Sequence, residues 1–327
     1  MYLEKPAETD LNMHGITTPH LYSLAVHGGA GTIRREDLSP DQERAYRTAL
    51  KTAVSAGYAI LHRGGPALDA VEAAVAAMED SELFNAGRGS VFTHDERIEM
   101  DAAIMCGRSL EAGAVAAVEQ VRNPIRLARR VLDKSPHVML GGTGALQFAR
   151  DEQLPLESPD YFATEFRRRQ LQEARAADRV QLDHQAQKPD KYGTVGAVAK
   201  DAQGHLAAAT STGGITNKRY GRIGDSPIPG AGNYAKDATC AVSCTGLGEY
   251  FMRAVAAYDL SCLMEYQGLS LREAARHLIF DKLPALGGEG GLIAVDAGGR
   301  LVLPFHSEGM YRGWQYAGEE LHTAVFA

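Results

Sequence analysis

Residues 193–212 read GTVGAVAKDAQGHLAAATST, and this stretch decides the fold. Two nearly continuous apolar segments flank the turn sequence DAQG, which predicts an antiparallel hairpin. Strands this apolar are typical of a sheet that is covered on both faces. Residues 290–305, GGLIAVDAGGRLVLPF, repeat the strand–turn–strand pattern. Because helical segments accompany both hairpins, the pattern predicts an α+β fold with four layers, α-β-β-α.

Other segments supply the helices and shorter strands. Apolar spacing predicts helices over residues 40–63, 67–78, 249–260 and 271–280, and a further helix that begins at the glycines of 141–148. Strands are expected at 23–26, 138–140 and 241–244, a hairpin at 90–93 and 98–105, and a helix pair over 112–133 that breaks at Asn123-Pro124. Residues 1–21 are interpreted as a loose arm, and the charged segment 157–193 as a helix that frays into a mobile linker.

Composition excludes several classes of function. The 327 residues include 41 acidic and 34 basic side chains, for a net charge of −7. Without a basic stripe, the chain is a poor partner for nucleic acid or an anionic membrane. No apolar run approaches the roughly 18 residues of a membrane helix, and residues 1–21 lack the apolar core of a signal peptide. We therefore expect a cytoplasmic protein.

The familiar metal, nucleotide and nucleophile motifs are missing from the sequence. It contains no GxSxG elbow, HExxH pair or Walker A loop. Glycines within 141–144 follow a strand but lack the full GxGxxG spacing, which favours helix packing over a dinucleotide site. Four cysteines (Cys106, Cys240, Cys244 and Cys262) are too few for a disulfide scaffold. Cys240 and Cys244 have no ligand histidine nearby, so buried thiols are expected instead of zinc.

Thr194 stands where the charged segment meets the first apolar strand. A threonine hydroxyl is a weak nucleophile unless a base lies beside it. The residue's own α-amino group, with a pKa of about 7.7–8.0 when free, can be that base. This role requires cleavage of the Gly193–Thr194 bond, so that Thr194 begins a chain. The alternative is a β-branched residue that simply starts a strand.

Hydroxyl side chains gather at the far end of the same hairpin. Residues 210–214 read TSTGG, and in an antiparallel hairpin this end lies beside the start of the first strand. We therefore expect Thr210 to Thr212 near Thr194.

Two loops supply charges and hydrogen-bond donors. In GRIGDSP (221–227), Arg222 suits a carboxylate and Asp225 an ammonium, so together they form a socket for the zwitterionic head of an α-amino acid. A surface ion pair of little energetic value is the alternative. In SCTGLGEY (243–250), the hydroxyl of Thr245 and the N–H of Gly246 follow a strand and can form an oxyanion hole, or an ordinary strand-to-helix turn.

Seven segments resemble those of the plant-type L-asparaginases and isoaspartyl aminopeptidases, which are N-terminal-nucleophile hydrolases. The segments are LAVHGGAG, LFNAGRGSVFTHD, YGTVGAVA, AAATSTGG, GRIGDSPIPGAGNYA, SCTGLGEY and GGEGGLIAVD, which lie within residues 22–322. The resemblance implies an αββα sandwich that forms one structural domain and is made as an inactive precursor. The precursor would cleave itself before Thr194 into an α chain (1–193) and a β chain (194–327).

The resemblance also implies an activity and the residues that perform it. The family hydrolyses L-asparagine and β-aspartyl dipeptides, with Thr194 as nucleophile and Thr212 orienting its hydroxyl. Arg222 would bind the substrate α-carboxylate and Asp225 the α-ammonium. The remaining site residues would be the oxyanion donors Thr245 and Gly246, Gly248 with its carbonyl, and Asn85 beside the nucleophile.

The resemblance further implies a homodimer of αβ heterodimers, a mobile glycine loop at His27–Gly31 and no catalytic cofactor. A structural sodium ion would be bound by backbone carbonyls of Met78, Glu79, Ser81, Phe84, Ala86 and Arg88. The sequence is also compatible with two alternative functions. One is a glycosylasparaginase-type amidase of the same fold, and the other is a non-catalytic amino-acid-binding relative.

Overall fold

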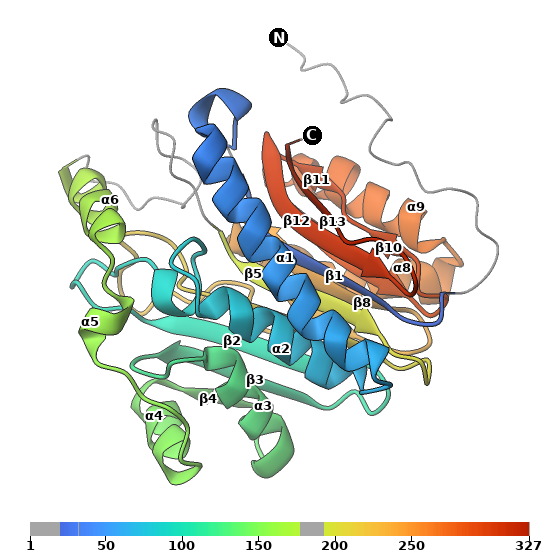
Figure 1. Cartoon of the computed structure of the whole chain (residues 1–327), viewed down its shortest axis with the longest axis horizontal. Helices are drawn as coiled ribbons and strands as arrows, with labels where there is room; N and C mark the ends of the chain where they lie inside the picture. The colour runs from blue at the N-terminus through green and yellow to red at the C-terminus, as the bar shows by residue number, and fades with distance from the viewer. Residues whose placement is uncertain (1–19, 32, 177–192, 327) are drawn as a thin grey trace.

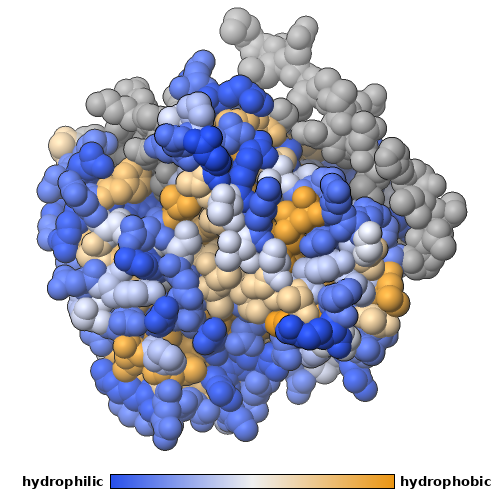
Figure 2. Space-filling view, viewed as in Figure 1, coloured by the Kyte–Doolittle hydropathy of each residue, from blue (hydrophilic) through white to orange (hydrophobic). Residues whose placement is uncertain are grey.

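The computed structural model describes residues 20–31, 33–176 and 193–326. Two β-sheets and the helices that pack on them account for most of these residues (Figure 1). Among the described residues, no helix is long and apolar enough to cross a membrane. The face seen in Figure 1 shows mainly hydrophilic side chains, with smaller apolar patches between them (Figure 2).

The larger sheet has eight strands in the order β13-β12-β1-β5-β6-β2-β3-β4. They are β1 (Ser23–Gly31), β2 (Met100–Cys106), β3 (Ala112–Val118), β4 (Met139–Gly141), β5 (Val195–Lys200), β6 (Leu206–Thr212), β12 (Gly309–Tyr316) and β13 (His322–Phe326). Only the β3–β4 pair is parallel among these described strands. The predicted hairpin β5–β6 lies at the centre of the sheet and is fully buried, as its apolar sequence indicated.

The smaller sheet has the order β10-β9-β8-β7, with β11 also paired to β9. Its strands are β7 (Asn233–Ala235), β8 (Cys240–Gly246), β9 (Gly290–Asp296), β10 (Leu301–Val302) and β11 (Phe305–His306). Cys240 and Cys244 on β8 are buried free thiols, as expected.

Alternate residues of each central strand belong to different apolar clusters, because successive side chains point to opposite faces of a sheet. Ala197 packs in a cluster with helices α1 (Pro40–His62), α2 (Ala67–Glu79) and α3 (Pro124–Lys134). Its neighbour Val198 packs with Ile293 and Val295 of the smaller sheet. On the smaller sheet, Leu292 packs with α8 (Ala256–Gln267) and α9 (Leu271–Arg276). Each sheet therefore contacts helices through one face and the other sheet through the opposite face.

The remaining helices are short or peripheral. They are α4 (Gly142–Asp151), α5 (Pro159–Phe162), α6 (Glu165–Ala176), α7 (Gly248–Ala254), α10 (Leu283–Ala285), 3-10 turns at Arg35–Asp37 and Gly87–Gly89, and a π-helical turn at His277–Lys282. The predicted linker thus begins with α5 and α6, and its residues 177–192 lie outside the described part, as do residues 1–19 of the predicted arm.

Several sequence predictions of elements were wrong. Residues 112–118 form strand β3 and not a helix, because the small residues of AGAVAAV fit a buried strand between two neighbours. Residues 90–93 make no hairpin strand, and Thr93 has only an isolated bridge to Lys218. The helix predicted over 249–260 is two helices, since Val255 adopts a left-handed φ of 48° between α7 and α8. Strands β7, β12 and β13 were missed.

Candidate active site

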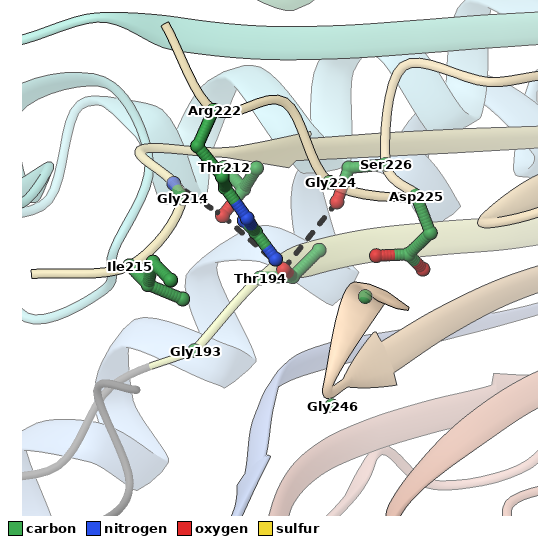
Figure 3. A pocket seen from close by; sticks show the side chains of 11 residues that line it. Gly193, Thr194, Thr212, Gly214, Ile215, Arg222, Gly224, Asp225, Ser226 and Gly246 are labelled. Carbon is green, nitrogen blue, oxygen red and sulfur yellow. Dashed lines mark hydrogen bonds between the residues drawn. The ribbon is translucent and has the colours of Figure 1, made fainter. Parts of the chain in front are cut away.

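A cavity lies where strand β5 begins and strands β6 and β8 end (Figure 3). Its lining residues come from these strand ends, from the loop after β6 and from the start of α7. They are Gly193, Thr194, Thr212, Gly214, Ile215, Arg222, Gly224, Asp225, Ser226, Gly246 and Gly248. Seven of the residues predicted from the sequence therefore meet at one cavity. Thr245 and Asn85 do not line it.

The sheet register sets the surroundings of Thr194. Because Val195 pairs with Ser211, Thr194 lies opposite Thr212 at the end of the hairpin. The Thr194 hydroxyl donates to Oγ1 of Thr212 at 3.2 Å and lies 3.4 Å from the Ser226 hydroxyl. The N–H of Gly214 also donates to Oγ1 of Thr212, at 3.0 Å, which fixes the orientation of that side chain.

Only the last hydroxyl of the TSTGG segment lines the cavity. Thr210 contacts the Ser243 hydroxyl at 2.7 Å between the sheets. Ser211, on the other face of the sheet, donates to the buried carboxyl of Glu79 at 2.6 Å. The expectation that all three hydroxyl residues lie near Thr194 was therefore too broad, because side chains alternate along a strand.

Gly193 is held against the glycine-rich part of strand β1. The strand was expected to end at Val26, but it continues to Gly31 with an irregularity between His27 and Gly29. Gly29 has a φ of +115°, and a Cβ placed there would lie 2.5 Å from the backbone N of Gly193. No side chain fits at that contact, so the glycine allows the backbone before Thr194 to approach β1.

Asp225 is a buried carboxyl with an unused acceptor. The residue is 4% exposed, and its Oδ2 has no hydrogen-bond partner among the described residues. Burial raises the pKa of Asp225 to about 7. Cβ atoms at Gly248 and Gly232 would come within 2.7 Å of Oδ1 and 2.8 Å of Oδ2. The glycines on both sides thus let the backbone pack closely against the carboxylate, whose Oδ2 is left as an acceptor for a cation.

Arg222 is oriented by Glu249, a contact that the sequence analysis missed. Its Nε and Nη2 donate to the two carboxylate oxygens of Glu249, each at 2.9 Å. Burial alone would raise the pKa of Glu249, but the hydrogen bond and charge of Arg222 lower it. No ion pair forms between Arg222 and Asp225 within the described part of the chain, so the surface-pair alternative was wrong. The signal for this contact was the glutamate at the end of GLGE, at the start of α7.

Thr245 and Asn85 do not line the cavity but contact or adjoin residues that do. The Thr245 hydroxyl oxygen accepts the N–H of Ala30 at 3.2 Å, which leaves its own proton free to be donated. Gly246, the next residue, lines the cavity. Asn85 binds the loop after β6, donating to the carbonyl of Gly214 at 2.8 Å.

The loop predicted to bind sodium, residues 78–88, is held together by hydrogen bonds between backbone groups. The carbonyl of Met78 accepts the N–H of Ser81 at 3.1 Å, and the carbonyl of Ala86 accepts that of Gly89 at 3.2 Å. The carbonyl oxygens of Glu79 and Phe84 lie against Gly87 and Gly89, where no Cβ fits. Two of the six carbonyls predicted as ligands thus already accept backbone N–H groups of the loop. Within the described residues, no cluster of three or more His, Cys, Asp or Glu side chains forms a metal site.

Comparison with known proteins shows the family of this chain. The chain belongs to the asparaginase family, whose model matches residues 20–325. It is 53% identical to the isoaspartyl peptidase of Salmonella typhimurium over 306 residues, which cover 93% of this chain and 98% of that protein. It is 44% identical to the plant-type L-asparaginase of Pyrobaculum calidifontis over 299 residues, 91% of this chain and 98% of that protein. Against the isoaspartyl peptidase/L-asparaginase of Bos taurus, the identity is 42% over 306 residues, 92% and 95% of the two chains. The family predicted from the sequence is confirmed.

Proposed function

We propose that this protein hydrolyses L-asparagine and β-aspartyl dipeptides, with Thr194 as an N-terminal nucleophile. One observation carries the proposal: the Thr194 hydroxyl, 3.2 Å from Thr212, shares a cavity with the cation of Arg222 and the buried carboxyl of Asp225. The names of the relatives, isoaspartyl peptidase and L-asparaginase, support the two substrate classes.

The protein is proposed to activate itself by cleaving the bond before Thr194. The Thr194 hydroxyl adds to the carbonyl carbon of Gly193, and the acyl group moves from nitrogen to oxygen as the peptide C–N bond breaks. The nitrogen takes the hydroxyl proton and becomes the free α-amino group of Thr194. Water then hydrolyses the ester, which releases residues 1–193 as the α chain and restores the Thr194 hydroxyl. The approach of Gly193 to Gly29 and the hydroxyl contact with Thr212 support this step.

In the mature enzyme the same hydroxyl attacks the substrate. The substrate α-carboxylate pairs with Arg222 and its α-ammonium with Asp225, which brings the β-carbonyl over Thr194. The oxygen of Thr194 bonds to the carbonyl carbon while its α-amine takes the proton, and Thr245 and Gly246 donate to the oxyanion. The C–N bond breaks as the leaving nitrogen receives the proton, releasing ammonia or an amino acid. Water then hydrolyses the β-aspartyl ester and releases aspartate.

The arrangement of layers and the assembly are part of the proposal. Apolar clusters on both faces of each sheet support the four-layer αββα sandwich of the N-terminal-nucleophile hydrolases. The carbonyls of the 78–88 loop would hold a structural sodium ion, which plays no part in the chemistry. A homodimer of αβ heterodimers is the proposed assembly.

Substrate assays on the purified protein test the proposed function. The wild type should release aspartate from both L-asparagine and β-aspartyl-leucine. Thr194→Ala should remain uncleaved and lose at least about a thousandfold in activity, because both reactions need the hydroxyl. An amino-acid-binding protein would instead stay as one band on a denaturing gel and bind aspartate without turnover. Activity of Thr194→Ala near the wild-type level would overturn the proposal.

A further inference from the structure

We propose that Ile215 forms the contact for the leaving amino acid of β-aspartyl dipeptides, and so determines how this enzyme ranks peptides against asparagine. The inference rests on the proposed function and names a specificity residue for it. Ile215 is the only apolar side chain larger than a threonine methyl among the eleven residues that line the cavity within the described chain.

The position of Asp225 relative to Thr194 indicates which side of the cavity receives the leaving group. In Figure 3, Asp225 and Gly246 lie on one side of Thr194, and Ile215 lies on the opposite side with Gly193 and Gly214. The Arg222 side chain reaches Thr194 between these two sides (Figure 3). Asp225 therefore marks the polar side of the cavity, and Ile215 gives the opposite side an apolar side chain.

The geometry of the attacked carbon assigns these two ends. In the tetrahedral intermediate the carbon carries four groups: the Thr194 oxygen, the oxyanion, the aspartyl Cβ and the leaving nitrogen. The Cβ leads to Arg222 and Asp225, and the oxyanion faces Gly246. With these directions taken, the proposal places the leaving nitrogen on the side of Gly214 and Ile215.

The backbone around Ile215 is already fixed by hydrogen bonds. The N–H of Gly213 donates to the carbonyl of Asn85 at 3.0 Å, and Asn85 donates to the carbonyl of Gly214 at 2.8 Å. The N–H of Lys218 donates to the carbonyl of Ile215 at 3.2 Å. The amine of Lys218 is buried and bonds the carbonyl of Glu99 at 2.8 Å. Since the backbone on both sides of Ile215 is held, the loop keeps this residue at the cavity without a backbone rearrangement.

The consequence differs between substrates. Asparagine releases ammonia, which has no side chain to contact Ile215. A β-aspartyl dipeptide releases an amino acid whose side chain can bury apolar surface on it. Removing the outer carbons of Ile215 should therefore lower kcat/KM about 5- to 20-fold for an apolar leaving residue and leave asparagine nearly unchanged.

The test compares Ile215→Ala with a matched control in the same loop. Ile223 is 39% exposed and does not itself line the cavity, whereas its neighbours Arg222 and Gly224 do, so Ile223→Ala makes the same chemical change in this loop without removing a lining side chain. Each variant is first checked for complete maturation on a denaturing gel. The kcat/KM values are then measured for asparagine, β-aspartyl-glycine and β-aspartyl-leucine.

We expect Ile215→Ala to lose activity on β-aspartyl-leucine alone. Ile223→Ala should match the wild type on all three substrates. If Ile215→Ala does not mature, Ile215→Val keeps the branched shape and should give a smaller loss with the same substrate order. An equal loss on all three substrates, or no loss on β-aspartyl-leucine, overturns the inference. A wild type that hydrolyses none of the substrates would instead refute the proposed function.

Discussion

Replacing Asp225 by asparagine should stabilise the protein at alkaline pH and abolish its use of amino-acid substrates. Burial raises the pKa of Asp225 to about 7, whereas an aspartate in an unfolded chain titrates near 3.9. Between these two pH values, the unfolded chain loses the Asp225 proton while the folded chain keeps it. The free energy of unfolding therefore falls as pH rises through this window, and the full penalty is present above pH 7.

The size of the penalty follows from the difference in pKa. Each pKa unit corresponds to about 1.36 kcal/mol, so about three units set an upper limit of roughly 4 kcal/mol. We expect Asp225→Asn to gain about 1–4 kcal/mol at pH 8 and little at pH 4, because asparagine has no charge to desolvate. The pH-independent effects of the substitution are equal at both pH values and cancel when the two gains are subtracted.

Urea unfolding measures this difference in matched proteins. Thr194→Ala and the double variant Thr194→Ala/Asp225→Asn both remain uncleaved, so self-cleavage does not alter the comparison. Midpoints are determined at pH 4, 6 and 8. A change in stability that is the same at all three pH values, or that becomes less favourable as the pH rises, would refute the assignment of Asp225 as a carboxyl kept unsatisfied for a substrate cation.

Two further predictions concern Arg222. In matured enzyme, Arg222→Ala should lower kcat/KM for asparagine about 30- to 1,000-fold, and Arg222→Lys should recover only part of this, because lysine keeps the charge but loses the planar fork. If Arg222→Ala keeps near wild-type kcat/KM, the substrate α-carboxylate is bound by a residue other than Arg222. Glu249→Gln should raise KM severalfold with kcat little changed. The variant weakens the contact that orients Arg222, and this loss outweighs the gain from removing a half-exposed negative charge near the substrate carboxylate. A lower KM in this variant would show that repulsion between Glu249 and the substrate carboxylate is the larger effect.

Local sequence patterns predicted those parts of the site that depend on neighbouring residues. The hairpin turn DAQG sets the register that places Thr194 opposite Thr212, so this contact followed from sequence. The strand predicted over 241–244 likewise placed Thr245 and Gly246 at a strand end, close to the end of β8 at Gly246. Both features depend on short-range geometry, which a sequence encodes directly.

Contacts between distant segments could not be predicted in the same way. The bond from Ala30 to Thr245 joins the two sheets, and its partners are 215 residues apart. The contact of Arg222 with Glu249 requires α7 to pack beside the loop after β6. The alanine-rich residues 112–118 were misassigned because alanine favours helices locally, and only burial between β2 and β4 makes them a strand.

The appearance of a new N-terminus tests the central claim most directly. Freshly purified protein is incubated in native buffer, and samples are divided between N-terminal sequencing, intact mass measurement and an asparagine hydrolysis assay. The account predicts two fragments, of 193 and 134 residues (327 − 193), with Thr194 as the new N-terminus. Activity should rise in proportion to the cleaved fraction. Full activity in the intact chain, or cleavage at a different bond in the active form, would contradict it.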